Sequence, residues 1–194
     1  MITFSKKRNF SPKPAIFLDR DGTIVHDKPG HYLTDEKLLK LYKCAPQALK
    51  LLKKMGYMLI IVTNQSGIGR NYLSLTKSKK INLALQKKLS KLEIKIDGIY
   101  FCPHTPEDRC SCRKPQLGLA REALAKHKIA LKNSFMIGDK ISDIKFGQNL
   151  KIKTVFLKTG HGRTQFLKYG KKITASHIAK DILCAAKWIQ KTIQ

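Results

Sequence analysis

The chain has 194 residues, enough for one domain with a full core, and 42% of them are hydrophobic, as in an ordinary globular protein. No apolar run approaches the roughly 20 residues of a membrane span, and the N-terminus lacks the apolar middle of a secretory signal. A soluble, cytoplasmic protein is expected. The formal charge of +26 comes from 32 Lys and 7 Arg scattered without a stripe of interleaved aromatic residues, which favours a lysine-rich solvated surface over a nucleic-acid interface.

Residues 1–14 are basic and contain two prolines, which is typical of a flexible extension. From residue 15 to residue 194, apolar runs of strand length alternate with helical patterns. Such alternation predicts a single α/β domain, with a doubly wound, Rossmann-like parallel sheet covered on both faces. The expected strands are 15–19, 57–64, 98–101, 135–139 and 154–157, and the expected helices are 45–56, 74–91, one after Pro115, one from Ile141 and one ending near Trp188.

In such sheets ligands bind beyond the carboxyl ends of the strands, so the polar residues that follow each strand are the candidates for a site. The motif DRDGT at 19–23 places Asp19 and Asp21 on one face of an extended segment and turns Arg20 away. TNQSG at 63–67 and GDKISD at 138–143 follow two further strands. The chain has only 13 acidic residues, and four of them lie in the first and last motifs, a concentration that suits a divalent cation.

Each motif alone has an ordinary structural interpretation, either as an Asp-Gly turn or as the start of a helix. In this order, and together with Lys114, they resemble the four motifs of the haloacid dehalogenase superfamily of phosphatases. Only 41 residues separate Asp21 from Thr63, too few for a cap domain, so a capless member with an open site is expected.

The resemblance implies a phosphatase in which Asp19 attacks phosphorus and forms an aspartyl-phosphate. Asp21 would protonate the leaving alcohol and then activate water. Mg²⁺ would be held by Asp19, the backbone carbonyl of Asp21 and Asp139, since a carboxylate that attacks a phosphate dianion needs charge compensation.

Further residues would bind the phosphoryl oxygens or support the site. The resemblance assigns Thr63, the backbone at Asn64 and Lys114 to the phosphoryl group, with Lys140 and Asp143 as supporting residues. A Lys114→Ala variant is expected to lose most activity and to keep the fold.

The segment CPHTPEDRCSCRKP contains three thiols and one imidazole within eleven positions, the ligand set of a closed tetrahedral zinc site. The alternative is a redox pair of Cys110 and Cys112, which leaves the histidine without a part. A structural zinc ion would order a loop that has little apolar surface and would aim Arg113 and Lys114 at the phosphate site. The expected zinc ligands are Cys102, His104, Cys110 and Cys112.

Within the superfamily, this loop and its basic pair resemble a subfamily that contains D-glycero-D-manno-heptose 1,7-bisphosphate phosphatases and histidinol-phosphate phosphatases. The resemblance favours removal of the 7-phosphate of the heptose bisphosphate, in lipopolysaccharide or surface glycan biosynthesis, because the loops around the site are basic. Histidinol-phosphate phosphatase and polynucleotide 3′-phosphatase stay as alternatives, and a monomer is the default. The expected substrate-binding residues are Asn64, Gln65, Ser66, Arg70, Arg113, His31 and Arg163, with Lys28 and His161 on the same rim.

Overall fold

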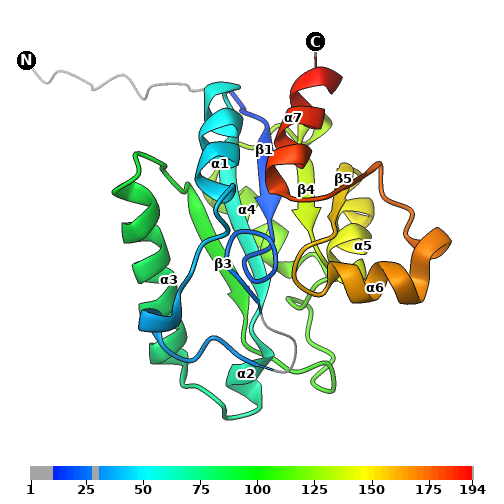
Figure 1. The fold of residues 1–194 in the computed structure, drawn as a ribbon. Coiled ribbons are helices and arrows are strands. Elements are labelled where there is room, and N and C mark those ends of the chain that lie inside the picture. The colour runs from blue at the N-terminus through cyan, green and yellow to red at the C-terminus, as the bar shows by residue number, and fades with distance from the viewer. Residues whose placement is uncertain (1–10, 28–30, 194) are drawn as a thin grey trace, which may run out of the picture.

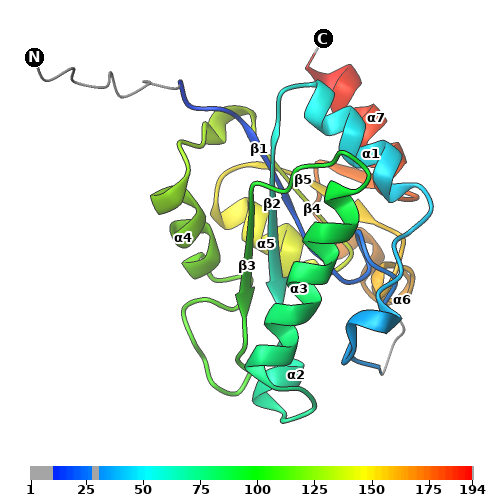
Figure 2. The ribbon, with the colours of Figure 1, turned by 90° about the vertical axis from the view of Figure 1, so that its left-hand side faces the viewer.

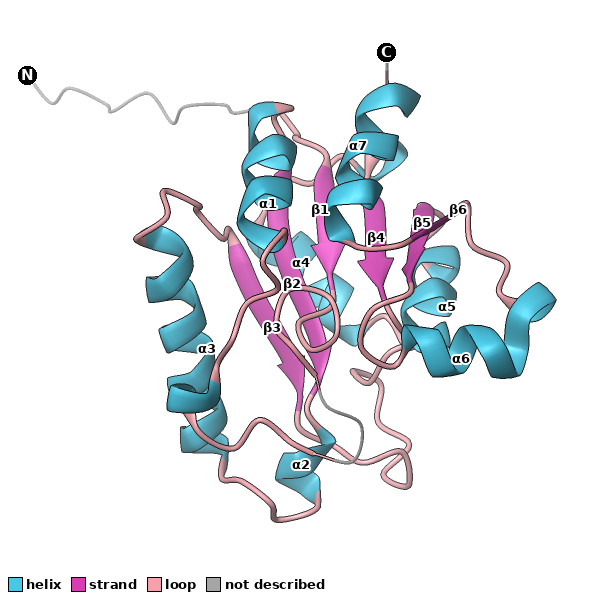
Figure 3. Ribbon diagram, in the orientation of Figure 1, coloured by secondary structure: helices cyan, strands magenta, loops and turns pink. Residues whose placement is uncertain are grey.

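The computed structural model describes residues 11–27 and 31–193, so most of the predicted N-terminal extension and Lys28 lie outside the described residues. The described chain forms a parallel sheet in the order β3-β2-β1-β4-β5-β6 (Figures 1 and 3). The predicted doubly wound α/β fold is confirmed. The strands are β1 Ala15–Leu18, β2 Met58–Asn64, β3 Gly98–Cys102, β4 Phe135–Gly138, β5 Lys153–Leu157 and β6 His177–Ala179.

Helices cover both faces of the sheet, as the view turned by 90° shows (Figure 2). One face carries α1 (Ala45–Lys54), α3 (Leu75–Ser90) and α7 (Ile182–Thr192), and the other carries α4 (Gly118–Lys126) and α5 (Ile141–Asn149). The remaining helices are α2 Ser66–Gly69, α6 Gly162–Tyr169, and the single 3₁₀ turns η1 Glu36–Leu38, η2 Leu131–Asn133 and η3 Gly170–Lys172.

The central strand β1 shows why the sequence adopts this fold. All four of its residues are buried, and successive side chains point to opposite faces. Ile16 and Leu18 pack in the core beneath α1 and α7, whereas Ala15 and Phe17 pack in the core beneath α4 and α5. A strand that is apolar on both faces fits only the middle of a sheet with two helical layers.

Among the elements that were not predicted from the sequence, β6 and α6 lie at one edge of the sheet, and α2 and the three 3₁₀ turns are short. β6 has three residues, of which only Ala179 is buried, so it carries almost no apolar pattern. In α6 only Gly162 is buried, and a helix that buries so little side-chain surface leaves no apolar stripe. None of the described helices combines the length and the apolar character that a bilayer span requires.

Candidate active site

The predicted motifs meet at the carboxyl ends of three adjacent strands. Leu18 of β1 lies opposite Ile61 of β2 and Ile137 of β4, so Asp19 follows between the two neighbouring strands. Its backbone N–H donates to the carbonyl of Ile137 at 3.0 Å. The parallel register therefore brings the DRDGT, TNQSG and GDKISD motifs into one site.

Lys114 lies at the centre of this site and is 3% exposed. Its ammonium Nζ is 2.8 Å from Asp19 Oδ1 and 2.6 Å from Asp143 Oδ1, and it donates to the carbonyl of Val62 at 2.7 Å. Burial alone would lower the pKa of Lys114, but the carboxylates of Asp143 and Asp19 outweigh it, and the pKa is raised. Burial opposes ionisation of Asp19, yet Lys114 and Lys140 hold its pKa below the ordinary value. Asp19 is thus a carboxylate, as a nucleophile must be.

The side chain of Asn64 holds the segment that carries Lys114. Asn64 Nδ2 donates to the carbonyl of Lys114 at 3.1 Å, and the N–H of Lys114 donates to Asn64 Oδ1 at 3.0 Å. The Asn64 amide thus satisfies both the N–H and the C=O of Lys114, as the backbone of a paired strand does. The end of β2 is therefore fixed to a loop residue 50 positions later.

Asp139, directly after β4, is a buried carboxylate that is only half satisfied. Its Oδ2 accepts from the N–H of His161 at 2.7 Å, but Oδ1 has no hydrogen-bond partner among the described residues. Burial raises its pKa well above the ordinary value; Lys140 opposes the shift, and the nearby Asp19 carboxylate adds to it. Carboxylate oxygens of Asp19, Asp139 and Asp143 lie within 4.8 Å of one another. The residues fit a hard divalent cation, which would satisfy the orphaned oxygen.

Two glycines allow backbone to pack against Asp139. Gly22 has φ +84°, and a β-carbon there would overlap the Asp139 carboxylate. A β-carbon at Gly160 would meet both Gly22 and Asp139. Thr159 Oγ1 donates to the carbonyl of Gly22 at 2.6 Å, which ties the two loops together. Backbone therefore packs closely against the Asp139 carboxylate.

Asp21 occupies the wall of the site, and its side chain is 17% exposed. Gln65 Nε2 donates to Asp21 Oδ2 at 2.8 Å and to Thr63 Oγ1 at 2.9 Å. The Gln65 amide is therefore committed to the protein, whereas the sequence suggested that it binds substrate. Arg20, which the sequence places on the opposite face, reaches back to the same carboxylate with its guanidinium.

The four predicted zinc ligands come together after β3. The sulfur atoms of Cys102, Cys110 and Cys112 are 3.1 to 3.5 Å apart. His104 Nδ1 lies 3.6 Å from Cys102 Sγ and 3.3 Å from Cys112 Sγ. With a Zn–S distance of about 2.3 Å, a tetrahedral site has sulfur atoms about 3.8 Å apart, so the cluster has the size of a metal site. All five cysteines are free thiols in this structure.

The Cys/His cluster is joined to the active site through the sheet. Cys102 pairs with Asn64 in the register of β3 with β2, and the N–H of Gln65 donates to the Cys102 carbonyl at 2.7 Å. Arg113 Nη1 donates to the carbonyl of His104 at 3.1 Å. The cluster therefore lies beside the residues that hold Lys114 and Asp21.

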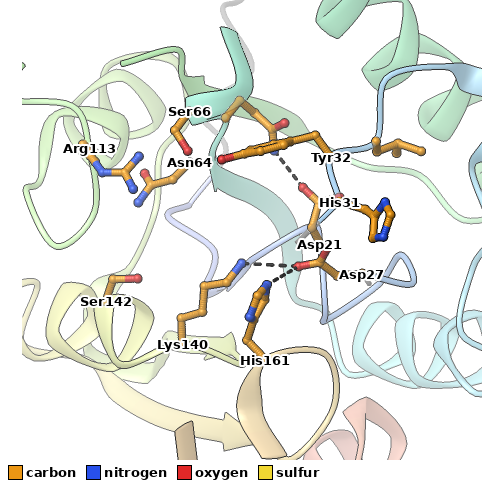
Figure 4. Close-up of a pocket in the computed structure, with 12 residues that line it drawn as sticks. Asp21, Asp27, His31, Tyr32, Asn64, Ser66, Arg113, Lys140, Ser142 and His161 are labelled. Carbon is orange, nitrogen blue, oxygen red and sulfur yellow. Dashed lines mark hydrogen bonds and ion pairs between the residues drawn. The ribbon is translucent and has the colours of Figure 1, made fainter. Parts of the chain in front are cut away.

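A pocket of about 260 Å³ opens above these residues (Figure 4). On one side Asp27 Oδ2 lies 3.1 Å from His161 Nε2 and 3.6 Å from Lys140 Nζ. Burial raises the pKa of Asp27, which Lys140 and His161 only partly oppose. Arg113 lies on the other side. The lining residues are Asp21, Asp27, His31, Tyr32, Leu33, Asn64, Gln65, Ser66, Arg113, Lys140, Ser142 and His161.

Two predicted substrate residues do not reach this pocket. Arg163 lines a separate pocket of about 660 Å³, because it lies on α6 beyond the turn that brings His161 to the site. Arg70 ends α2 and lies 3.9 Å from Glu107 Oε2. The pocket instead includes Tyr32 and Ser142, which no sequence pattern indicated.

Comparison with known proteins agrees with this geometry. Residues 111–185 match a family model described as HAD-hydrolase-like. The D-glycero-β-D-manno-heptose-1,7-bisphosphate 7-phosphatase of Helicobacter pylori (strain ATCC 700392 / 26695) is 45% identical over 144 residues, which cover 74% of this chain and 82% of that protein. This chain belongs to the haloacid dehalogenase-like phosphatases.

Other relatives extend the match along the chain of this phosphatase. The protein of the same name from Pasteurella multocida is 38% identical over 185 residues, covering 92% of this chain and 97% of that one. The histidine biosynthesis bifunctional protein of Blochmanniella floridana is 38% identical over 142 residues, which cover 72% of this phosphatase and 40% of that protein. The D,D-heptose 1,7-bisphosphate phosphatase of B. bronchiseptica, complexed with magnesium and phosphate, shares the fold with a TM-score of 0.83, at 24% identity and coverage of 92% and 99%.

Proposed function

We propose that this phosphatase removes the 7-phosphate of D-glycero-D-manno-heptose 1,7-bisphosphate in a Mg²⁺-dependent reaction. The observation that carries the proposal is the identity of 38% and 45% to proteins named for this activity, one of them matched over almost its whole length. The pocket agrees with a phosphorylated sugar, since it is polar and includes Arg113 and Lys140. A cytoplasmic location and a monomeric state are predictions that accompany it.

In the proposed mechanism Asp19 is the nucleophile, and Lys114 holds it in place and neutralises part of its charge. A bound Mg²⁺ ion, held by Asp19, the carbonyl of Asp21 and Asp139, would offset repulsion between the carboxylate and the phosphate dianion. Thr63 and the backbone at Asn64 would donate to the phosphoryl oxygens, and Asn64 lines the pocket. Asp21 gives a proton to the leaving oxygen and later takes one from water. Asp143 pairs with Lys114, and Lys140 adds positive charge near Asp19 and Asp139, so both residues balance the charge of the reacting groups.

We further propose that the cluster formed by Cys102, His104, Cys110 and Cys112 binds zinc in a structural role. It offers four ligand atoms and is a closed set, so it leaves no position for substrate. Its position next to Asn64 supports a role in fixing the loop that carries Arg113 and Lys114.

Histidinol phosphate is the second candidate substrate, supported by the similarity to part of the bifunctional histidine protein. Asp21 and Asp27 are the carboxylates of the pocket lining; Asp21 is bound by Arg20 and Gln65, and Asp27 already faces His161 and Lys140. The geometry therefore favours an anionic substrate. A polynucleotide 3′-phosphatase would depend steeply on salt, because binding to many phosphates releases counterions.

The deciding experiment measures phosphate release with Mg²⁺ from both anomers of the heptose bisphosphate, from histidinol phosphate and from a 3′-phosphorylated oligonucleotide. The proposal requires the highest kcat/KM for one of the bisphosphate anomers, with a shallow salt dependence. Asp19→Asn is the control and must abolish release. A higher kcat/KM for histidinol phosphate or for the oligonucleotide would refute the assignment of the substrate.

A further inference from the structure

Arg20 stands between the two aspartates of the DRDGT motif and is 1% exposed. Its Nε lies 3.1 Å from both carboxylate oxygens of Asp21, and its Nη2 donates to Asp21 Oδ2 at 2.9 Å. Two nitrogen atoms of the buried guanidinium thus bind the two oxygens of the Asp21 carboxylate. Two parallel charged hydrogen bonds fix the plane of a carboxylate as well as its position.

The guanidinium is itself anchored from two other elements. Arg20 Nη1 donates to Asn82 Oδ1 on α3 at 2.7 Å, and Nη2 donates to Gln65 Oε1 at 2.8 Å. Asn82 is 7% exposed and Gln65 is 6% exposed, so both acceptors are shielded from water. A long flexible side chain is therefore held at three points and cannot change rotamer without losing several buried hydrogen bonds.

The two oxygens of Asp21 are bound unequally. Oδ2 accepts from Arg20 Nη2 at 2.9 Å and from Gln65 Nε2 at 2.8 Å, whereas Oδ1 shares only the bond from Arg20 Nε at 3.1 Å. The side chain lines the pocket, and its remaining exposed surface faces the space that substrate would occupy (Figure 4). Oδ1 therefore accepts fewer hydrogen bonds from the described residues than Oδ2 does.

Stability alone is a weak reason for this arrangement. Burying the Arg20 guanidinium against the partly exposed Asp21 carboxylate costs desolvation energy, and buried ion pairs are often no better for stability than apolar residues of similar size. An ion pair made by several directional hydrogen bonds does fix a geometry. A displacement of about 1 Å in a reacting group can reduce a rate by about 100-fold.

We propose that Arg20 and Gln65 are positioning residues that fix the place and the plane of the Asp21 carboxyl group, so that it meets the leaving oxygen in the first half of the reaction and the attacking water in the second. The inference rests on the proposed function. In the first half, Asp19 forms a bond to phosphorus, the bond from phosphorus to the alkyl oxygen breaks, and a proton moves from Asp21 to that oxygen. In the second half, water attacks phosphorus, its proton moves to Asp21, and the bond to Asp19 breaks, which restores the starting state.

The test compares leaving groups in the first turnover. An alkoxide leaving group requires the proton from Asp21, whereas p-nitrophenolate leaves as a stable anion without one. In the Arg20→Met variant, the first-turnover rate at which the heptose bisphosphate is cleaved should fall about 100-fold. The first-turnover rate of p-nitrophenolate release from p-nitrophenyl phosphate should fall less than about 10-fold. With p-nitrophenyl phosphate the aspartyl-phosphate should accumulate, because water still needs Asp21 as its base. Arg20→Lys should recover only part of the loss, since an ammonium cannot form the fork.

Equal losses for both substrates, or unchanged rates, would overturn the positioning role. If Arg20→Met does not fold, the same two rates are compared in Gln65→Met, which removes the hydrogen bond to Asp21 Oδ2. The rate for the heptose bisphosphate should then fall about 10-fold more than the rate for p-nitrophenyl phosphate. The matched control is Lys79→Met, an exposed residue of α3 that should leave both rates unchanged. Wild-type protein that released no phosphate from either compound would overturn the proposed function itself, which separates the two failures.

Discussion

Replacing Lys114 by Met should reduce stability as well as activity, because this lysine neutralises carboxylates that water does not reach. Its Nζ lies 2.8 Å from Asp19 and 2.6 Å from Asp143, which are 3% and 0% exposed. Removing one partner of a buried ion pair typically costs about 3 to 5 kcal/mol, since the remaining charge is left without compensation. We expect a loss of this size in the free energy of unfolding. The sequence alone suggested a variant with an intact fold, and the burial of Lys114 changes that expectation.

Urea unfolding followed by circular dichroism, in Mg²⁺-free buffer, measures this loss. Burial already raises the pKa of Asp143, and removing Lys114 removes the cation that opposes the shift. A raised pKa in the folded state contributes stability at low pH and loses it as pH rises through that pKa. The deficit of the variant should therefore be largest near neutral pH and shrink as the solution is acidified.

The matched control is the double variant Lys114→Met/Asp143→Asn, which removes one uncompensated carboxylate. It should recover about half or more of the lost stability and stay inactive. A Lys114→Met protein as stable as the wild type at neutral pH would refute the electrostatic argument. So would a double variant less stable than the single one.

Asp139→Asn should abolish Mg²⁺-dependent phosphate release and yet raise the melting temperature in metal-free buffer, because it removes a buried carboxyl group whose Oδ1 finds no hydrogen-bond partner in the described part of the chain. Added Mg²⁺ should raise the melting temperature of the wild type only; an equal rise in the variant would count against the cation site. Removing zinc with a chelator should lower kcat and increase hydrogen exchange at 102–112, and unchanged values for both would disprove the coupling of that loop to Lys114. Arg113→Ala should raise KM for the heptose bisphosphate about 10-fold or more, whereas Arg163→Ala should change it less than about 2-fold, since only Arg113 lines the pocket. Equal effects in steady-state assays would show that the pocket is wrongly placed.

The sequence predicted those parts of the structure whose chemistry is local. Residues 15–18 are apolar and Asp19 is polar. This pattern predicts both a buried strand and a site residue at its carboxyl end. The gathering of the Cys/His cluster was predictable because its four side chains fall within eleven residues of one another, so their spacing alone limits the geometry. Asp139 was predicted as a site residue on the same ground as Asp19, since it directly follows an apolar strand.

Contacts made by side chains from distant elements could not be predicted. Asn82 lies on α3 at a position that looks like any polar helical residue, and only the packing of that helix brings it to Arg20. The alternation of a strand places Arg20 on the far face, but it does not show that a long side chain can fold back to Asp21. Arg163 was assigned to the substrate rim because its loop passes the site, yet the helix that follows carries its side chain elsewhere.

The four proposed zinc ligands lie close together along the chain, and this closeness has a thermodynamic consequence. A ligand stabilises a folded protein only by the difference between its affinities for the folded and unfolded states. Ligands confined to residues 102–112 can gather around an ion before the sheet has formed, so the unfolded chain should also bind zinc well. The ion should then act mainly on local order and contribute much less to global stability than its affinity suggests. Cells starved of zinc would on this basis retain a folded phosphatase that works poorly, instead of losing the protein.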